Sequence, residues 1–93
     1  MKASGEMILR KIAGEYILIP TGTTALRIHG MITMTESGIL LWKKLKSDCT
    51  REELISAILS EYDIDRRTAE TDVDAFLAKL DALQILDRSE ADE

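Results

Sequence analysis

A single cysteine, Cys49, and a single histidine, His29, are the side chains of this chain best suited to nucleophilic chemistry. Such a pair acts in catalysis when the histidine removes the thiol proton and a third group orients the histidine. Neither residue lies in a recognisable catalytic motif, and a Cys and a His rarely act together without one. We therefore interpret Cys49 as a semi-buried loop residue. Because one cysteine cannot form an internal disulfide, it also fits a reducing compartment.

Metal ligands are equally few. One His and one Cys cannot complete a closed zinc site without carboxylates. The stretch Asp63-Ile64-Asp65 resembles the start of a calcium loop, but Arg67 and Thr68 stand where an oxygen ligand and the turn glycine belong. The two aspartates are better interpreted as acids at a helix start, which the helix dipole favours. We expect no metal, no cofactor and no catalytic residue.

The part of the chain before Thr35 predicts short strands, because it is rich in β-branched residues and holds four of the five glycines. Residues 7–12 and 15–19 are β-prone runs joined by Ala13-Gly14, a connection short enough for a hairpin. A turn or loop follows at residues 20–23. Residues 26–34 predict a third extended segment, interrupted at His29-Gly30. Together these runs indicate a small antiparallel sheet of three strands.

The part of the chain after Thr35 predicts three helices. Thr35 can cap the first, Thr50 and Glu53 form a capping box for the second, and Asp65 can cap the third. Apolar residues at helical spacing follow each start. In the third and longest helix they are Ala69, Val73, Phe76, Leu77, Leu80 and Leu83.

These elements predict an α+β fold that is winged helix-turn-helix-like, with an N-terminal three-stranded antiparallel sheet followed by three helices. A length of 93 residues fits a single domain, residues 1–93. We expect its ordered core to cover about residues 6–86 and its acidic C-terminal tail, residues 87–93, to be frayed.

Charge and hydropathy restrict the partners. The formal net charge is −5, from 17 acidic and 12 basic residues, so phosphate binding gains little from electrostatics. The helix-turn-helix outline keeps a DNA-binding transcriptional regulator as the alternative function. However, residues 65–84 hold three basic and five acidic residues, which would repel phosphates. No apolar run approaches the ~20 residues of a membrane span, so we expect a cytoplasmic protein without membrane or nucleic-acid partners.

Several short motifs occur in a fixed order along most of the chain, from about residue 8 to residue 86. They are Tyr16-Ile-Leu-Ile-Pro20, Gly30-Met-Ile-Thr-Met-Thr-Glu-Ser-Gly38, Leu41-Trp42 with Leu45, Glu52-Glu53-Leu54, Glu61-Tyr62-Asp63, and Asp72-Val73 with Phe76-Leu77 and Leu80. In this order they resemble the pyrroloquinoline quinone biosynthesis protein D (PqqD) family. Members often have Leu-Asn in place of Met34-Thr35, a departure that leaves a good helix cap.

The resemblance implies a non-enzymatic recognition element for ribosomally synthesised, later modified peptides. Such a protein binds the leader of a precursor peptide as an extra strand and presents it to a modifying enzyme, often a radical S-adenosylmethionine enzyme. Strand addition needs an exposed sheet edge and no catalytic residue. We expect a monomer or a homodimer. On this basis the expected peptide-binding residues are Gly30, Met31, Ile32, Thr33, Arg66, Arg67, Val73 and Leu77.

Overall fold

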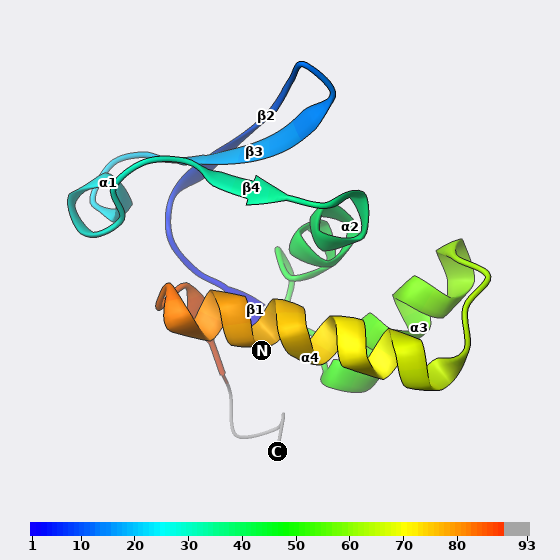
Figure 1. Ribbon diagram of the computed structural model, residues 1–93. Coiled ribbons are helices and arrows are strands. Elements are labelled where there is room, and N and C mark those ends of the chain that lie inside the picture. The colour runs from blue at the N-terminus through cyan, green and yellow to red at the C-terminus, as the bar shows by residue number, and fades with distance from the viewer. Residues whose placement is uncertain (89–93) are drawn as a thin grey trace.

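The chain folds into a small antiparallel sheet with helices packed against one of its faces (Figure 1). The computed structural model describes residues 1–88. In chain order the elements are β1 (Lys2–Ala3), β2 (Met7–Ile12), β3 (Glu15–Pro20), α1 (Thr24–Arg27), β4 (Ile32–Met34), α2 (Glu36–Lys44), α3 (Arg51–Glu61), α4 (Arg66–Ala82) and β5 (Leu86–Asp87). The main sheet has the order β2-β3-β4, which confirms the expected α+β fold with three antiparallel strands.

The hairpin of β2 and β3 forms as the sequence predicts. The two strands pair in register from Met7–Pro20 to Ile12–Glu15, and Ala13 and Gly14 make the turn. Both turn residues have positive φ, 52° and 83°. This is the backbone of a type I′ turn, whose twist matches that of the flanking strands.

The third extended segment is shorter than expected, and a fourth, short helix replaces its beginning. Residues 24–27 form α1, which was not predicted, and only residues 32–34 of the expected segment 26–34 form β4, whereas the three helices expected after Thr35 are present as α2, α3 and α4. Local side-chain bonds explain the difference. Glu6 accepts hydrogen bonds from the backbone N–H and the hydroxyl of Thr23, at 3.4 and 3.1 Å, and Thr24 accepts one from the Glu6 N–H at 2.7 Å. They hold the chain in a helical turn despite its β-branched residues.

The three long helices begin where their caps predict. Thr35 and Asp65 each accept a hydrogen bond from the backbone N–H three residues later, at 3.0 and 2.8 Å. Thr50 and Glu53 exchange hydrogen bonds of 3.1 and 2.9 Å, which completes the capping box. Each cap satisfies helix-start N–H groups that have no partner within the helix. The predicted helix starts are therefore confirmed.

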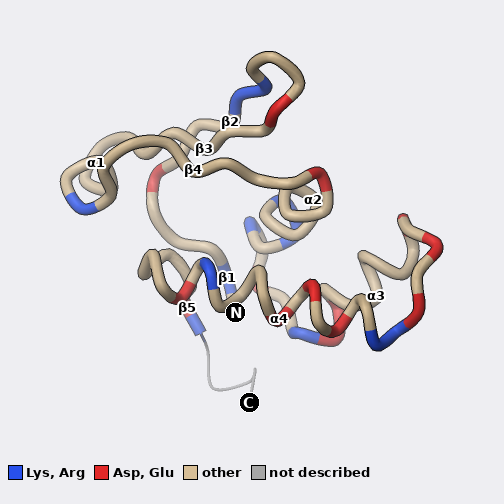
Figure 2. Tube along the Cα trace, viewed as in Figure 1, with Lys and Arg blue, Asp and Glu red and all other residues tan. Residues whose placement is uncertain are grey.

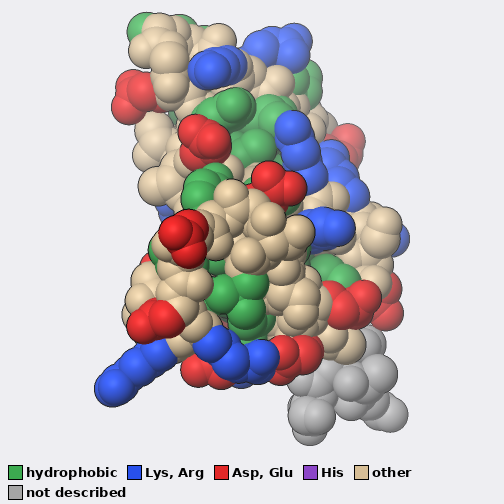
Figure 3. Space-filling model, turned by 90° about the vertical axis from the view of Figure 1, so that its right-hand side faces the viewer, with side chains coloured by type: hydrophobic (Ala, Val, Ile, Leu, Met, Phe, Trp, Pro, Cys, Tyr) green, Lys and Arg blue, Asp and Glu red, His purple; other side chains and the backbone are tan. Residues whose placement is uncertain are grey.

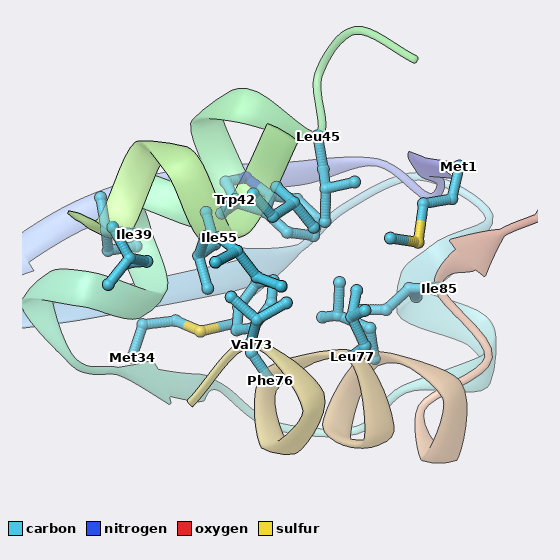
Figure 4. Packing of buried hydrophobic residues seen from close by; sticks show 14 of the residues in the cluster. Met1, Met34, Ile39, Trp42, Leu45, Ile55, Val73, Phe76, Leu77 and Ile85 are labelled. Carbon is cyan, nitrogen blue, oxygen red and sulfur yellow. The ribbon is translucent and has the colours of Figure 1, made fainter. Parts of the chain in front are cut away.

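The core lies between the sheet and the helices, and α4 contributes the largest share of it. In Figure 4 the inner face of α4 points into this core, with Val73, Phe76 and Leu77 lying toward α2 and α3. The core cluster consists of Met1, Leu18, Ile32, Met34, Ile39, Leu41, Trp42, Leu45, Leu54, Ile55, Ile58, Ala69, Val73, Phe76, Leu77, Leu80 and Ile85. The helix therefore has an inner face fixed by packing, next to a second face that looks toward β4.

A second, two-stranded sheet joins the beginning of the chain to the end of α4. In it β1 pairs with β5, through Lys2–Asp87 and Ala3–Leu86. Met1 is 1% exposed and packs in the core, so packed structure begins before the residue 6 expected from the sequence. Of the acidic tail, residues 89–93 lie outside the described residues. Within residues 1–88 no helix is both long enough and apolar enough to cross a bilayer.

Replacing Thr50 with Ala should lower the free energy of unfolding by about 1 kcal/mol, because the Glu53 N–H loses its acceptor. For a domain of this size the change corresponds to a fall of about 4–8 °C in Tm, measurable by thermal unfolding followed by circular dichroism. Thr50→Ser is the matched control, since it keeps the hydroxyl and should keep most of the stability. An equal loss in both variants would assign the effect to packing rather than to the cap.

Candidate functional site

The free edge of β4 is the most distinctive surface of the fold. β4 pairs only with β3, and the ladder begins and ends on the pairs Leu18–Ile32 and Tyr16–Met34, whose backbone groups face β3. In an antiparallel ladder, residue pairs that hydrogen-bond to each other alternate with pairs whose N–H and C=O groups point away from the partner strand. Thr33, between them, therefore presents both its N–H and its C=O at the free edge.

One helix lies beside this edge. The Thr33 carbonyl oxygen accepts a hydrogen bond of 2.7 Å from Nζ of Lys79, which belongs to α4. Figure 1 shows α4 running beneath β4, and residues of both elements line the same hollows, so the edge and the helix form the two walls of a groove. We call this the β4–α4 groove.

The groove contains two hollows. The larger has a volume of about 530 Å³ and is lined by Glu15, Thr33, Met34, Thr35, Ser37, Gly38, Leu41, Asp72, Ala75, Phe76 and Lys79. The smaller has a volume of about 370 Å³ and is lined by Met31, Ile32, Thr33, Lys79, Ala82 and Leu83. Only Thr33 and Lys79 line both hollows, so their hydrogen bond divides the groove in two.

Three of the residues expected at the site line this groove. Ile32 is 7% exposed and faces the core, whereas Met31, at 61% exposed, faces solvent, as the alternation of side chains along a strand predicts. Both residues line the smaller hollow, and Thr33 lies between the hollows. Gly30 precedes the strand with a φ of +88°, a conformation that favours glycine.

The structure does not bring the other expected residues to the groove. Val73 and Leu77 are 0% and 4% exposed and belong to the core, so their side chains do not form the floor as expected. Arg66 donates hydrogen bonds to Glu52, at 2.6 Å, and to Glu70, at 3.1 Å, which holds it at the junction of α3 and α4. Arg67 is exposed at the start of α4 and lines neither hollow.

The floor of the groove comes from residues that the sequence reasoning did not select. On α4 they are Asp72, Ala75, Phe76, Lys79, Ala82 and Leu83. Their spacing of i, i+3, i+4, i+7, i+10 and i+11 defines one helix face. This face lies next to the buried stripe, so helical periodicity could have identified it once the stripe was assigned to the core. Nothing in the sequence indicated which neighbouring face looks toward β4.

Cys49 and His29 lie in different parts of the molecule. Cys49 lines a hollow formed by the end of α2 and by α3, whereas His29 lines one between α1 and the end of α4. Burial raises the pKa of the Cys49 thiol, and the nearby Glu53 carboxylate raises it further. A raised pKa lowers the fraction of reactive thiolate. Among the described residues no three His, Cys, Asp or Glu side chains gather into a metal site.

Several charged side chains of α3 and α4 form ion pairs on the surface. Arg51 donates two hydrogen bonds to Asp74, at 2.8 and 2.9 Å, and these bonds hold the pKa of the Asp74 carboxyl below its ordinary value. The hydrogen bond from Thr68 likewise lowers the pKa of Asp65. Arginines stand at the starts of α3 and α4 and mostly acidic residues follow them, while β4 carries no charged residue (Figure 2).

Figure 3 shows acidic and basic side chains interspersed over this face, with hydrophobic patches between them. A duplex-binding face would gather lysines and arginines around the helix that enters the groove of the DNA. Here α4 carries paired carboxylates instead, as for Asp74 and Glu70. This surface does not favour the DNA-binding alternative.

A free strand edge beside a helix, with two partly apolar hollows, is the arrangement of a domain that binds a peptide as an added strand. The chain belongs to the family described as "Coenzyme PQQ synthesis protein D (PqqD)", which matches residues 15–86. The resemblance found in the sequence motifs is thereby confirmed.

The chain is similar to a solved structure described as "TbiB1 in Complex with the TbiA(beta) Leader Peptide". The two sequences are 28% identical, the TM-score is 0.71, and the match covers 96% of this chain and 98% of the other. No curated protein sequence matches the chain.

Cys49 should react slowly with a thiol reagent at neutral pH in the folded protein, because its raised pKa lowers the thiolate fraction. The rate of alkylation by iodoacetamide, measured against pH, should rise at a higher pH in the native state than in urea. Cys49→Ser should leave the fold and partner binding unchanged. A native alkylation profile at or below that of the unfolded chain would contradict this description of the thiol.

Proposed function

We propose that this chain is a non-catalytic adaptor that binds an extended segment of a precursor peptide along β4 and presents it to a peptide-modifying enzyme. The observation that carries the proposal is the outward-facing N–H and C=O of Thr33, at a strand edge that borders the β4–α4 groove. Backbone groups of this kind bind another strand, and the hollows on either side supply contacts for its side chains.

The alternation of a strand fits the two hollows. A peptide residue opposite Thr33 would exchange two backbone hydrogen bonds with it and would point its side chain to the same face as Thr33. The side chains of the preceding and following peptide residues would then point to the face of Ile32 and Met34. On that face one side chain would meet the larger hollow and the other the smaller one. Two hollows separated by one strand residue therefore suit a peptide whose alternate side chains enter them, one on each side of Thr33.

The comparisons support a precursor leader as the peptide. The similar protein TbiB1 was solved with a leader peptide, and its whole length corresponds to this chain. Membership in the PqqD family agrees with a role in making a modified peptide, with a radical S-adenosylmethionine enzyme as the partner that the family resemblance favours. Gly30, Met31, Ile32 and Thr33 then form the strand side of the binding site, and the outer face of α4 forms the other side.

The proposal can be tested with fluorescein-labelled leader segments of the short peptides encoded beside this chain and a modifying enzyme. Fluorescence polarisation should detect saturable binding, and amide-shift mapping should place it on residues 31–33 and the outer face of α4. Shifts confined to α2 and α3 would contradict the placement on β4. Failure of every such leader to bind would contradict the function itself.

Thr33→Pro should weaken binding of the best of these leaders, because proline removes the N–H that points outward at the free edge. One backbone hydrogen bond is worth about 1 kcal/mol, so the Kd should rise roughly fivefold or more. Thr33→Val is the matched control, since it keeps the N–H and the β-branched shape. Equal Kd values for the two variants, with unchanged thermal unfolding, would exclude strand addition at Thr33.

A further inference from the structure

The hydrogen bond that crosses the groove occupies the acceptor that an added strand needs. Lys79 Nζ lies 2.7 Å from the Thr33 carbonyl oxygen, the outward acceptor of β4. An N–H of an added peptide would take the same oxygen. The Lys79 ammonium then shares this oxygen with the peptide N–H or leaves it, and in both cases it lies in the groove beside the peptide.

Lys79 has no acidic partner of its own among residues 1–88. The residues one turn before and after it on this face of α4 are uncharged: Ala75, Phe76, Ala82 and Leu83. Of the nearby acids, Asp81 binds Arg88, at 2.8 Å. Asp72 shares the larger hollow but lies seven residues away, about 10 Å along the helix axis. The ammonium is therefore satisfied mainly by a neutral carbonyl.

The charges of the groove differ between its two halves. Glu15 and Asp72 line the larger hollow. Lys79 is the one charged residue among the described residues that line the smaller hollow. Beyond it, Arg27 lines the adjoining surface and donates a hydrogen bond of 3.4 Å to the Leu83 carbonyl. An acidic peptide side chain is thus repelled in the half near Met34 and attracted in the half near Met31.

We propose that Lys79 is a specificity-determining residue, which selects peptide strands carrying an aspartate or glutamate over the half of the groove near Met31. This inference rests on the proposed function. Once the peptide N–H takes the Thr33 oxygen, the carboxylate accepts a charge-assisted hydrogen bond from the ammonium, which is stronger than the bond to a neutral carbonyl. A peptide without this carboxylate leaves the ammonium to compete with the peptide N–H for one neutral oxygen. The same preference fixes where the strand lies along β4, because only one half of the groove attracts the acid.

The experiment is selection from a display library of randomised short peptides against the wild-type protein, Lys79→Met and Lys79→Glu. The wild type should enrich Asp or Glu at one position, Lys79→Met should lose this enrichment, and Lys79→Glu should enrich Lys or Arg there instead. Lys79→Arg should keep the acidic preference. Lys43→Met serves as the matched control, because this exposed lysine of α2 lines neither hollow and its loss should change nothing.

The affinities of a selected peptide and of its analogue with Asn or Gln in place of the acid then measure directly how much the carboxylate contributes to binding. For the wild type the analogue should bind roughly fivefold more weakly at low salt, with a smaller difference at high salt, as for an exposed ion pair. For Lys79→Met the two peptides should bind equally. If Lys79→Glu selected the same acidic consensus as the wild type, the proposed role of Lys79 would be wrong, while the adaptor function would still be supported. Selection of no peptide by the wild type would overturn both.

Discussion

The burial of the inner face of α4 is the contact on which the rest of the structure depends. Ala69, Val73 and Leu80 are completely buried, and they hold the helix against α3 and beneath the sheet. The apolar face of the sheet must be buried against another element, and the helices cover it here. Once this face is packed, the rotation of α4 is fixed, and a single lysine side chain can bridge the space to β4. The width of the groove is therefore set by the core.

The shortness of β4 limits what backbone pairing can contribute to recognition. Thr33 alone among residues 32–34 presents its backbone groups outward. A ladder this short provides only a few hydrogen bonds, each of modest net value because water competes for the same groups. Discrimination between peptides must then come from the hollows, where Phe76 and Met34 provide apolar contact and Lys79 provides charge. The ammonium on the Thr33 oxygen also makes the edge less open to indiscriminate pairing with other strands.

Sequence reasoning succeeded where local chemistry decides the structure. The Ala13-Gly14 turn and the caps at Thr35, Thr50 and Asp65 follow from short-range hydrogen bonds and φ preferences. It failed for α1, where the Glu6 carboxylate comes from a distant part of the chain and fixes a turn that the β-branched residues disfavour. For the site, the family resemblance indicated the strand residues, and the alternation of side chains along a strand predicted which of them face the core.

Periodicity did not show which side of α4 looks toward β4. Val73 and Leu77 were therefore assigned to the groove, although Phe76 and Lys79 line it. The rotation of the helix depends on how it packs against α3 and the sheet, and no local pattern contains that information. The two faces of α4 are nevertheless separate. Substitutions of exposed residues such as Asp72, Lys79 and Ala82 leave the core positions untouched, and changes of this kind cost little stability. The module can thus be re-targeted to a new peptide at a few positions of one helix, while the fold that carries them stays the same.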